Sequence, residues 1–351
     1  MKAKLTGLAV LLLVILLAGA YSVLSKGTET TEITGYVGGE KIGLLEDEEV
    51  QKVIREKYGI EIDYSRAGSI EMVTEDHTGM DYLFPSSQTA LELYEEQYGS
   101  PVKSEIVLNT PIVLYARAAV TDALLEEGIA WEENGSCYVD MEKLAACIEE
   151  GKAWADIGLS ELYGNVTVAT TDPTKSNSGN MFAGLLANTL YGGTVGEANV
   201  EEVLPRLQTI FRNLGYMESS SSDLFDQFLK TGIGAKPMVA GYENQLLEFA
   251  AENPDTWEQI KDDIRMMYPS PTVWSSHIFI ALDEEGANAV DALLDEEVQR
   301  LAWERHGFRT GIGGSAADTG SFGVDGVARE VTRVMNMPGA AAMERIIEAL
   351  Q

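Results

Sequence analysis

The residues that most clearly suggest a chemical role are Ser176-Asn177-Ser178-Gly179, which follow a turn at Asp172-Pro173. An apolar, strand-like run precedes the turn and residues at helical spacing follow it, so this order predicts that the four residues open a helix. Two interpretations stay open. Ser and Asn side chains often cap a first turn by accepting hydrogen bonds from its N–H groups. Alternatively, those N–H groups and the positive end of the helix dipole hold an electronegative ligand.

Three other segments carry hydroxyl groups. AGS at 67–69 is a small-residue turn after a predicted strand, PSSQT at 85–89 leads from a predicted strand to a helix, and SSSSDLF at 219–225 opens a predicted helix. The last segment allows the same two interpretations, a helix cap or one wall of a polar ligand site.

The first glycine-rich turn, Gly39-Glu40-Lys41, introduces two opposite charges. A buried Lys41 would neutralise an anionic ligand, whereas Glu40 would repel an anion or bind an amine. The sequence therefore leaves the charge of a ligand open.

A second hypothesis is an exported serine acyl-transfer enzyme of the penicillin-recognising type. Ser100 with Lys103, Ser178 with Asn180, and Lys230-Thr231-Gly232 occur in the order of its three short motifs. The predicted elements disagree with those motifs, because Ser100 precedes a strand and Lys230 follows a helix. A third hypothesis is a surface module for binding or sensing without transport.

No metal site is expected from the sequence. Glu75-Asp76-His77, with Asp81 nearby, is better explained as a solvated polar turn in an acidic chain. GIGGS at 311–315 does not stand between a strand and a helix, so a dinucleotide site is not expected either, and no cofactor is predicted.

Strand-like runs alternate with amphipathic helical patterns along the chain, which predicts an α/β fold with mixed, mostly parallel sheets flanked by helices. The long run EIVLNTPIVLYA at 105–116 resembles a connector that leaves one lobe, and PMVAGYENQ at 237–245 a return to it. We therefore predict two lobes, with residues 30–115 and 240–351 in lobe 1 and residues 116–239 in lobe 2. A ligand cleft is expected at the hinge between them.

The composition fits a globular and strongly acidic protein. The chain has 351 residues, 45% of them hydrophobic, and a formal net charge of -31 at pH 7. Such a charge disfavours binding to nucleic acid or to an anionic membrane surface.

Residues 1–26 have the layout of a secretory signal peptide, with two lysines, an apolar run and the small residues Ala18-Gly19-Ala20. The apolar run is nearly long enough to span a membrane, so an uncleaved N-terminal anchor is the alternative. In both cases we expect an exported protein. Export permits a disulfide between Cys137 and Cys147, but two buried thiols are an equal alternative.

An ordered set of segments resembles the type II periplasmic binding proteins of ABC importers, nearest the molybdate and sulfate oxyanion binders. It comprises the glycine-rich first turn, AGSIEMV, MDYLFPSSQTAL, IVLNTPIVLYA, TVATTDPTKSNSGNMFAGLLANTL, KPMVAGYENQ, YPSPTVW and EEVQRLAWERHGFRTG, between about residues 32 and 312.

The resemblance implies a monomeric, non-enzymatic protein that clamps a small polar ligand between its lobes and delivers it to the membrane subunits of an ABC permease. By position it implies ligand contacts from Ser69, Ser178 and Tyr242. The full set of expected ligand-binding residues is Gly39, Lys41, Ser69, Ser87, Ser176, Asn177, Ser178 and Tyr242.

Overall fold

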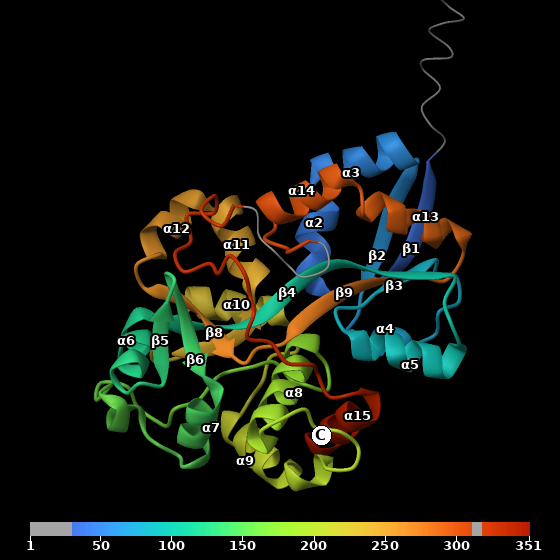
Figure 1. Cartoon of the computed structure of the whole chain (residues 1–351). Coiled ribbons are helices and arrows are strands. Elements are labelled where there is room, and N and C mark those ends of the chain that lie inside the picture. The colour runs from blue at the N-terminus through green and yellow to red at the C-terminus, as the bar shows by residue number, and fades with distance from the viewer. Residues whose placement is uncertain (1–29, 311–317) are drawn as a thin grey trace, which may run out of the picture.

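The computed structural model describes residues 30–310 and 318–351, and the predicted signal or anchor at 1–26 lies outside them. Its strands form one continuous mixed sheet with the order β2-β1-β3-β9-β4-β8-β6-β5, and β7 also pairs with β4. The sheet is bent into two lobes that share β4 and β9 (Figure 1). This two-lobed α/β architecture is the predicted fold class.

The first lobe is built on β1, β2 and β3, with β9 and the first half of β4 at its inner edge. Helices α3, α13 and α14 cover one face of this sheet, and α4 and α5 cover the other. The bounds are β1 (Thr31–Val37), η1 (Gly39–Lys41), α2 (Ile42–Glu46), α3 (Glu48–Val53), η2 (Ile54–Tyr58), β2 (Ile60–Arg66), α4 (Glu71–Thr74), β3 (Tyr82–Phe84), α5 (Gln88–Tyr98), β4 (Lys103–Arg117), β9 (Trp274–Ala281), α13 (Glu284–Leu293) and α14 (Glu296–Glu304).

The second lobe is built on β5, β6, β7, β8 and the second half of β4. Helices α6 to α9 pack on one face, and α10 to α12 pack on the other. The bounds are α6 (Ala118–Glu126), β5 (Ala130–Glu133), β6 (Ser136–Asp140), α7 (Met141–Glu149), η3 (Trp154–Ile157), α8 (Asn177–Tyr191), η4 (Val200–Glu202), α9 (Leu204–Leu214), α10 (Ser221–Lys230), β7 (Met238–Tyr242), α11 (Glu243–Glu252), α12 (Pro254–Ile260), β8 (Ile264–Ser270) and α15 (Ala340–Ala349).

The strand pairing places the return to the first lobe later than residue 240. Strands β7 and β8 pair with the second half of β4, so residues 238–270 lie in the second sheet, and the chain returns along β9. The C-terminal helix α15 also packs into the core of the second lobe. The apolar side chains at 237–245 show that this segment is a buried strand. They do not show whether the strand pairs in the sheet of the first lobe or beside β4 in the second.

The sheet is mixed, as predicted, but it has fewer parallel pairs than expected. Only β1–β2, β1–β3 and β6–β8 are parallel among the strands of the described ranges. The strand pairs at the hinge are antiparallel because β7, β8 and β9 each run back alongside β4. The strand-like run predicted before the turn at Asp172-Pro173 forms an isolated bridge instead, between Ala169 and Val239.

The two cysteines carry free thiols, Cys147 buried and Cys137 partly so. Burial raises the pKa of both thiols, most strongly that of Cys137, to about 11. They therefore act as small apolar side chains in and beside the core of the second lobe.

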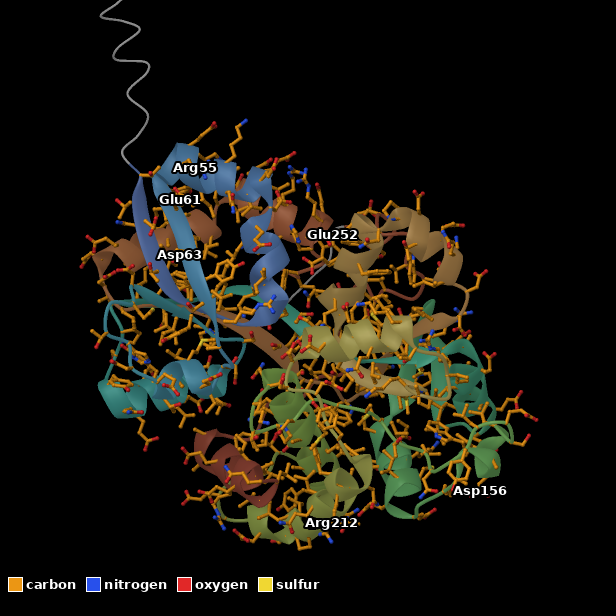
Figure 2. The ribbon with its side chains drawn as sticks, turned by 180° about the vertical axis from the view of Figure 1, so that it is seen from behind. Arg55, Glu61, Asp63, Asp156, Arg212 and Glu252 are labelled. Atoms are coloured by element: carbon orange, nitrogen blue, oxygen red, sulfur yellow. The ribbon has the colours of Figure 1, made fainter. Side chains whose placement is uncertain are left out.

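Charged side chains lie at the periphery of both lobes. Arg55 and Glu61 form a loose pair of 3.7 Å on the first lobe, while Asp156 and Arg212 lie exposed on the second lobe (Figure 2). Among the described residues, no helix is both long and apolar enough to cross a membrane.

Candidate functional site

A cleft of about 570 Å3 lies where the two lobes face each other. The first lobe contributes the turn after β1 and the segment after β2, and the second lobe contributes the starts of α8 and α10. Its lining residues are Gly38, Gly39, Glu40, Arg66, Ala67, Gly68, Ser69, Ile70, Glu71, Thr74, Thr174, Lys175, Ser176, Asn177, Ser219, Ser220, Ser221 and Tyr242. Small and polar side chains dominate this surface, which suits a small polar ligand.

The start of α8 leaves its first N–H groups without a side-chain cap. Ser176 stands at the N-cap position, but its hydroxyl lies 3.1 Å from Ser178 Oγ and accepts no hydrogen bond from the helix. Ser178 Oγ lies 2.7 Å from Thr171 Oγ1. A β-carbon at residue 179 would lie 2.2 Å from the Thr171 carbonyl, so Gly179 permits this close packing. The first turn can therefore donate to a ligand.

The start of α10 is arranged differently. Ser220 Oγ accepts a hydrogen bond of 3.3 Å from the Asp223 N–H and so caps the helix. Ser219, Ser220 and Ser221 still line the cleft. The serine run therefore caps α10 and also lines the cleft.

Asn177 joins the lobes at the base of the cleft. Its Nδ2 donates to the Ser86 carbonyl at 2.9 Å and to the Tyr242 hydroxyl at 3.0 Å. Ser86 follows β3 in the first lobe, whereas Asn177 begins α8 in the second. Burial raises the pKa of Tyr242 well above its ordinary value, so the hydroxyl keeps its proton.

Lys41 lies behind the cleft wall and is fully buried. Its ammonium donates to Glu40 Oε1 and Ser86 Oγ, both at 2.6 Å, and approaches His277 Nδ1 at 3.3 Å. Burial, together with the Lys41 charge, lowers the pKa of His277 well below its ordinary value, so the neutral ring can accept this hydrogen bond. Burial lowers the pKa of Lys41, and the contact with Glu40 opposes that shift.

The structure brings five of the eight predicted site residues to the cleft surface: Gly39, Ser69, Ser176, Asn177 and Tyr242. The other three, Lys41, Ser87 and Ser178, are buried beside it. Sequence reasoning did not single out Arg66, Glu71 or Lys175 as site residues. They are exposed at the rim, and nothing in their local pattern distinguishes them from other surface charges.

The three motifs of the acyl-transfer hypothesis are engaged elsewhere. Lys103 Nζ donates to Asp291 at 2.7 Å, and Lys230 Nζ donates to Asp226 at 2.6 Å. The hydroxyl of Ser178 is held by Thr171 and Ser176. Lys103, the base that this hypothesis would require for Ser100, is therefore paired with an aspartate.

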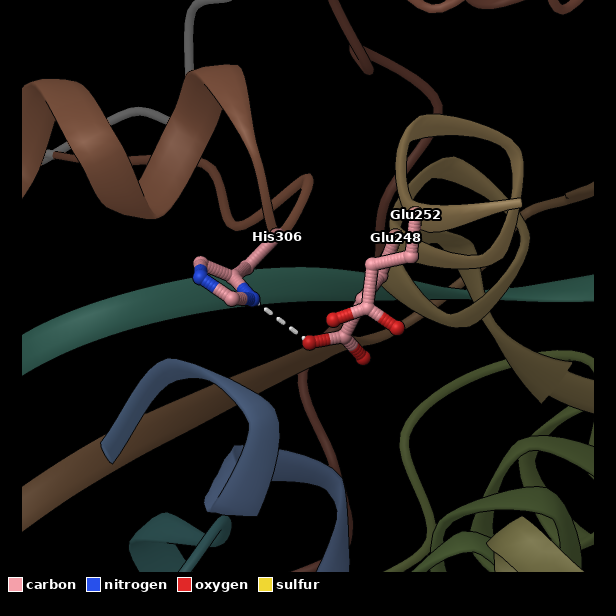
Figure 3. Close-up of side chains that lie close together, drawn as sticks. All are labelled: Glu248, Glu252 and His306. Carbon is pink, nitrogen blue, oxygen red and sulfur yellow. Dashed lines mark hydrogen bonds and ion pairs between the residues drawn. The ribbon is translucent and has the colours of Figure 1, made fainter. Parts of the chain in front are cut away.

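A separate cluster of Glu248, Glu252 and His306 lies where α11 meets the end of α14 (Figure 3). His306 Nδ1 contacts Glu248 at 2.6 Å and Nε2 contacts Asp47 at 3.2 Å, so carboxylates engage both ring nitrogens. Burial lowers the pKa of His306, but Glu248 and Asp47 outweigh it and raise the pKa overall. We interpret the cluster as an ion-pair contact between the lobes. In the turn at 75–81, Asp76 accepts a hydrogen bond from the neighbouring Thr78, and Asp81 accepts one from the Thr34 N–H of β1.

No protein-family model matches the sequence, and no curated protein matches it. Solved structures do match. A periplasmic thiamin-binding protein superposes with a TM-score of 0.63 at 12% identity, over 92% of this chain and 96% of that one. An ABC-transporter substrate-binding protein from Agrobacterium tumefaciens gives 0.58 at 13% identity, over 93% and 96%. The sulfate-binding protein of Mycobacterium tuberculosis gives 0.53 at 14% identity, over 89% and 95%. The chain therefore has the two-lobed fold of periplasmic binding proteins.

Proposed function

We propose that the protein is an exported solute-binding protein that captures a small polar ligand between its lobes and delivers it to an ABC importer. The observation that carries this proposal is the cleft itself. Both lobes line it, and its walls consist of hydroxyl groups, glycines and two helix starts.

Closing of the lobes provides the mechanism. A ligand that contacts both lobes favours the closed arrangement by its differential affinity for that state. The lobes approach each other closely on both sides of the cleft: a β-carbon at Gly68 would lie 2.6 Å from the Lys175 carbonyl, and one at Gly39 would lie 3.6 Å from Ser222 Oγ. The protein can therefore enclose a small ligand with short main-chain contacts.

We assign direct ligand contact to Gly39, Ser69, Ser176, Asn177 and Tyr242, which line the cleft. Ser178 acts indirectly, because its hydroxyl holds Ser176 and Thr171. Lys41 and Ser87 support the cleft wall from behind.

The ligand is expected to be small and polar rather than a flat aromatic molecule. Among the lining residues only Tyr242 is aromatic, and it is 1% exposed. Thiamin and sulfate, named for two of the similar structures, are chemically unlike, so the fold alone does not choose between such ligands.

Export, delivery to permease subunits, a monomeric state and the absence of an enzymatic activity belong to the same proposal. The signal-like segment at 1–26 supports export, by cleavage or by tethering. The fold supports the partnership with a permease, because the similar structures include a substrate-binding protein of an ABC transporter.

The test is a thermal-shift screen of the mature chain against sulfate, molybdate, phosphate, amino acids and polyamines, combined with mass spectrometry of copurified small molecules. A bound ligand raises the melting temperature by mass action. Ser176→Ala should weaken binding of that ligand about tenfold, the effect of one lost hydrogen bond to a charged group. Ser160→Ala, an exposed serine in the same lobe, is the matched control and should not change it. If no compound stabilises the protein and none copurifies, the proposed function is wrong.

A further inference from the structure

Glu40 presents a carboxylate oxygen to the cleft. Its side chain is 6% exposed, and the residue lines the cleft surface. Oε1 accepts hydrogen bonds from Lys41 Nζ and Ser86 Oγ. In residues 30–310 and 318–351, no hydrogen bond reaches Oε2. One oxygen of this carboxylate is therefore available to a ligand.

The carboxylate is ionised at neutral pH. Burial alone would raise the pKa of Glu40, but the charge of Lys41, together with His277 and the hydrogen bonds from Lys41 and Ser86, outweighs burial, and the pKa falls to about 2. Lys41 has three protons to donate, and Glu40, Ser86 and His277 take all three. Lys41 thus balances the charge of Glu40 without reaching the ligand.

Asn177, at the start of α8, supplies a second acceptor from the second lobe. The Ser86 carbonyl can only accept a hydrogen bond, so the amide nitrogen of Asn177 must face it, and this fixes the orientation of the amide group. Oδ1 then has no hydrogen-bond partner within the described parts of the chain, although Asn177 is only 8% exposed. A buried acceptor without a donor is costly, so this atom also calls for a donor.

Hydrogen-bond donors lie on the wall that the second lobe contributes, across the cleft from Glu40. The first turn of α8 has no side-chain cap, and the hydroxyls of Ser176 and Ser219 to Ser221 line the cleft beside it. Of the exposed charges at the rim, Arg66 and Lys175 are positive and Glu71 is negative, which leaves one positive charge in excess. A ligand that satisfies both walls must accept hydrogen bonds toward the second lobe and donate one toward Glu40.

We infer that the cleft selects a small anion that carries its own hydrogen-bond donor, and that Glu40 determines this specificity. The donor is the O–H of a hydrogen phosphate or the N–H of a zwitterion. Sulfate and molybdate are fully deprotonated at neutral pH, so they would place bare oxygens against the Glu40 carboxylate and are rejected. The inference rests on the proposed solute-binding function and narrows the ligand of that same cleft.

The experiment compares matched ligands by calorimetry and thermal shift at constant ionic strength and pH 7. Inorganic phosphate offers an O–H, glycine and aminomethylphosphonate offer an N–H, and sulfate and molybdate offer neither. At least one donor-bearing ligand should bind about tenfold to a hundredfold more tightly than sulfate or molybdate, the effect of one hydrogen bond to a charged group. The arm that binds tells whether the donor is oxygen or nitrogen.

Glu40→Gln tests the residue directly. An amide can donate as well as accept, so the preference over sulfate should fall about tenfold or more. Glu61→Gln makes the same chemical change at an exposed site on β2 of the same lobe and should keep the wild-type preference (Figure 2). Because Glu40→Gln leaves Lys41 buried beside a neutral group, the double variant Glu40→Gln/Lys41→Met serves as a second, charge-balanced version.

The outcomes separate the two proposals. If sulfate or molybdate binds as tightly as every donor-bearing ligand, the inference about Glu40 is overturned while the solute-binding function stands. If no ligand of either kind binds, both proposals fall. If neither variant folds, the comparison of phosphate, glycine and aminomethylphosphonate with sulfate on the wild-type protein still decides the inference.

Discussion

At the scale of single residues, the cleft depends on which polar groups are already satisfied. From the sequence, Lys41 is expected to bind an anionic ligand. In the structure, however, its three N–H donors point to Glu40, Ser86 and His277. Ser176 stands at a helix start but does not cap it, so the N–H groups of α8 stay available. The residues that can bind a ligand are therefore those whose hydrogen-bond donors or acceptors are not already used within the protein.

Gly68 lies at a close approach of the two lobes beside the cleft. A β-carbon there would stand 2.6 Å from the Lys175 carbonyl oxygen, which belongs to the main chain and cannot move aside cheaply. Gly68→Ala should therefore disfavour the closed arrangement and weaken ligand binding about tenfold or more, because only the closed fraction binds tightly. Titration calorimetry with the ligand found by screening measures this loss.

Gly196→Ala is the matched control for Gly68. A β-carbon at Gly196 would meet no atom within 4 Å, so this variant should bind like the wild type. Equal affinities of both variants would show that the lobes do not approach at Gly68 when ligand is bound.

His306 makes the contact between the lobes dependent on pH. Its pKa is raised in the folded protein because Glu248 and Asp47 outweigh the opposing effect of burial; Arg305 binds Asp47 from the other side, and Glu252 lies close by. A raised pKa means that the stabilisation is fully present below the unfolded pKa and is lost as pH rises through the folded pKa.

His306→Gln should consequently destabilise the protein more at pH 6 than at pH 9. The expected loss at pH 6 is about 2 kcal/mol, the order of a hydrogen bond to a charged group. Urea unfolding of both proteins at the two pH values measures it. A difference between the proteins that does not change with pH would show that the pKa of His306 is the same in the folded and the unfolded protein.

At the scale of elements, the sequence predicted most of the helices but not where they dock. The helices predicted to begin within residues 85–89, 176–179 and 219–225 are α5, α8 and α10. The sheet joined by β7 could not be predicted, because a buried five-residue strand looks the same in either lobe.

The cleft could be predicted only in part, for a similar reason. Ser176, Asn177 and Ser69 stand at strand ends or helix starts, which local pattern reveals. The pairing of Lys41 with His277 joins segments 236 positions apart, so it depends on the completed hinge and left no local signal. The sequence showed that Lys41 carries a positive charge, whereas it did not show which groups would take up its hydrogen bonds.

Helix α15 illustrates docking over a long distance in the sequence. Ala342, Met343 and Ile346 are buried in the core of the second lobe, and the methionine lies near Gly184 of α8. Ile346→Ala should lower the free energy of unfolding by about 2 to 5 kcal/mol through the lost packing and the cavity left behind. Glu344→Ala on the exposed face of the same helix should change it by roughly 0.5 kcal/mol or less. Equal urea midpoints for the two variants would contradict the docking of α15.

At the scale of the whole molecule, the surplus of acidic groups limits stability. The chain has 56 acidic and 25 basic side chains, so most carboxylates cannot have a cationic partner even though several surface pairs such as Arg345 with Glu201 exist. Unpaired like charges repel one another more in the compact state than in the unfolded chain, and salt screens that repulsion over a Debye length of about 10 Å at 0.1 M.

The melting temperature should therefore rise by several degrees between 10 mM and 300 mM NaCl at pH 7, about 1 kcal/mol or more of added stability. Scanning calorimetry measures the rise, and sucrose of equal osmolality controls for effects of the solute that do not involve charge. A melting temperature that falls with salt would mean that the surface ion pairs outweigh the net repulsion, because screening would then remove more attraction than repulsion.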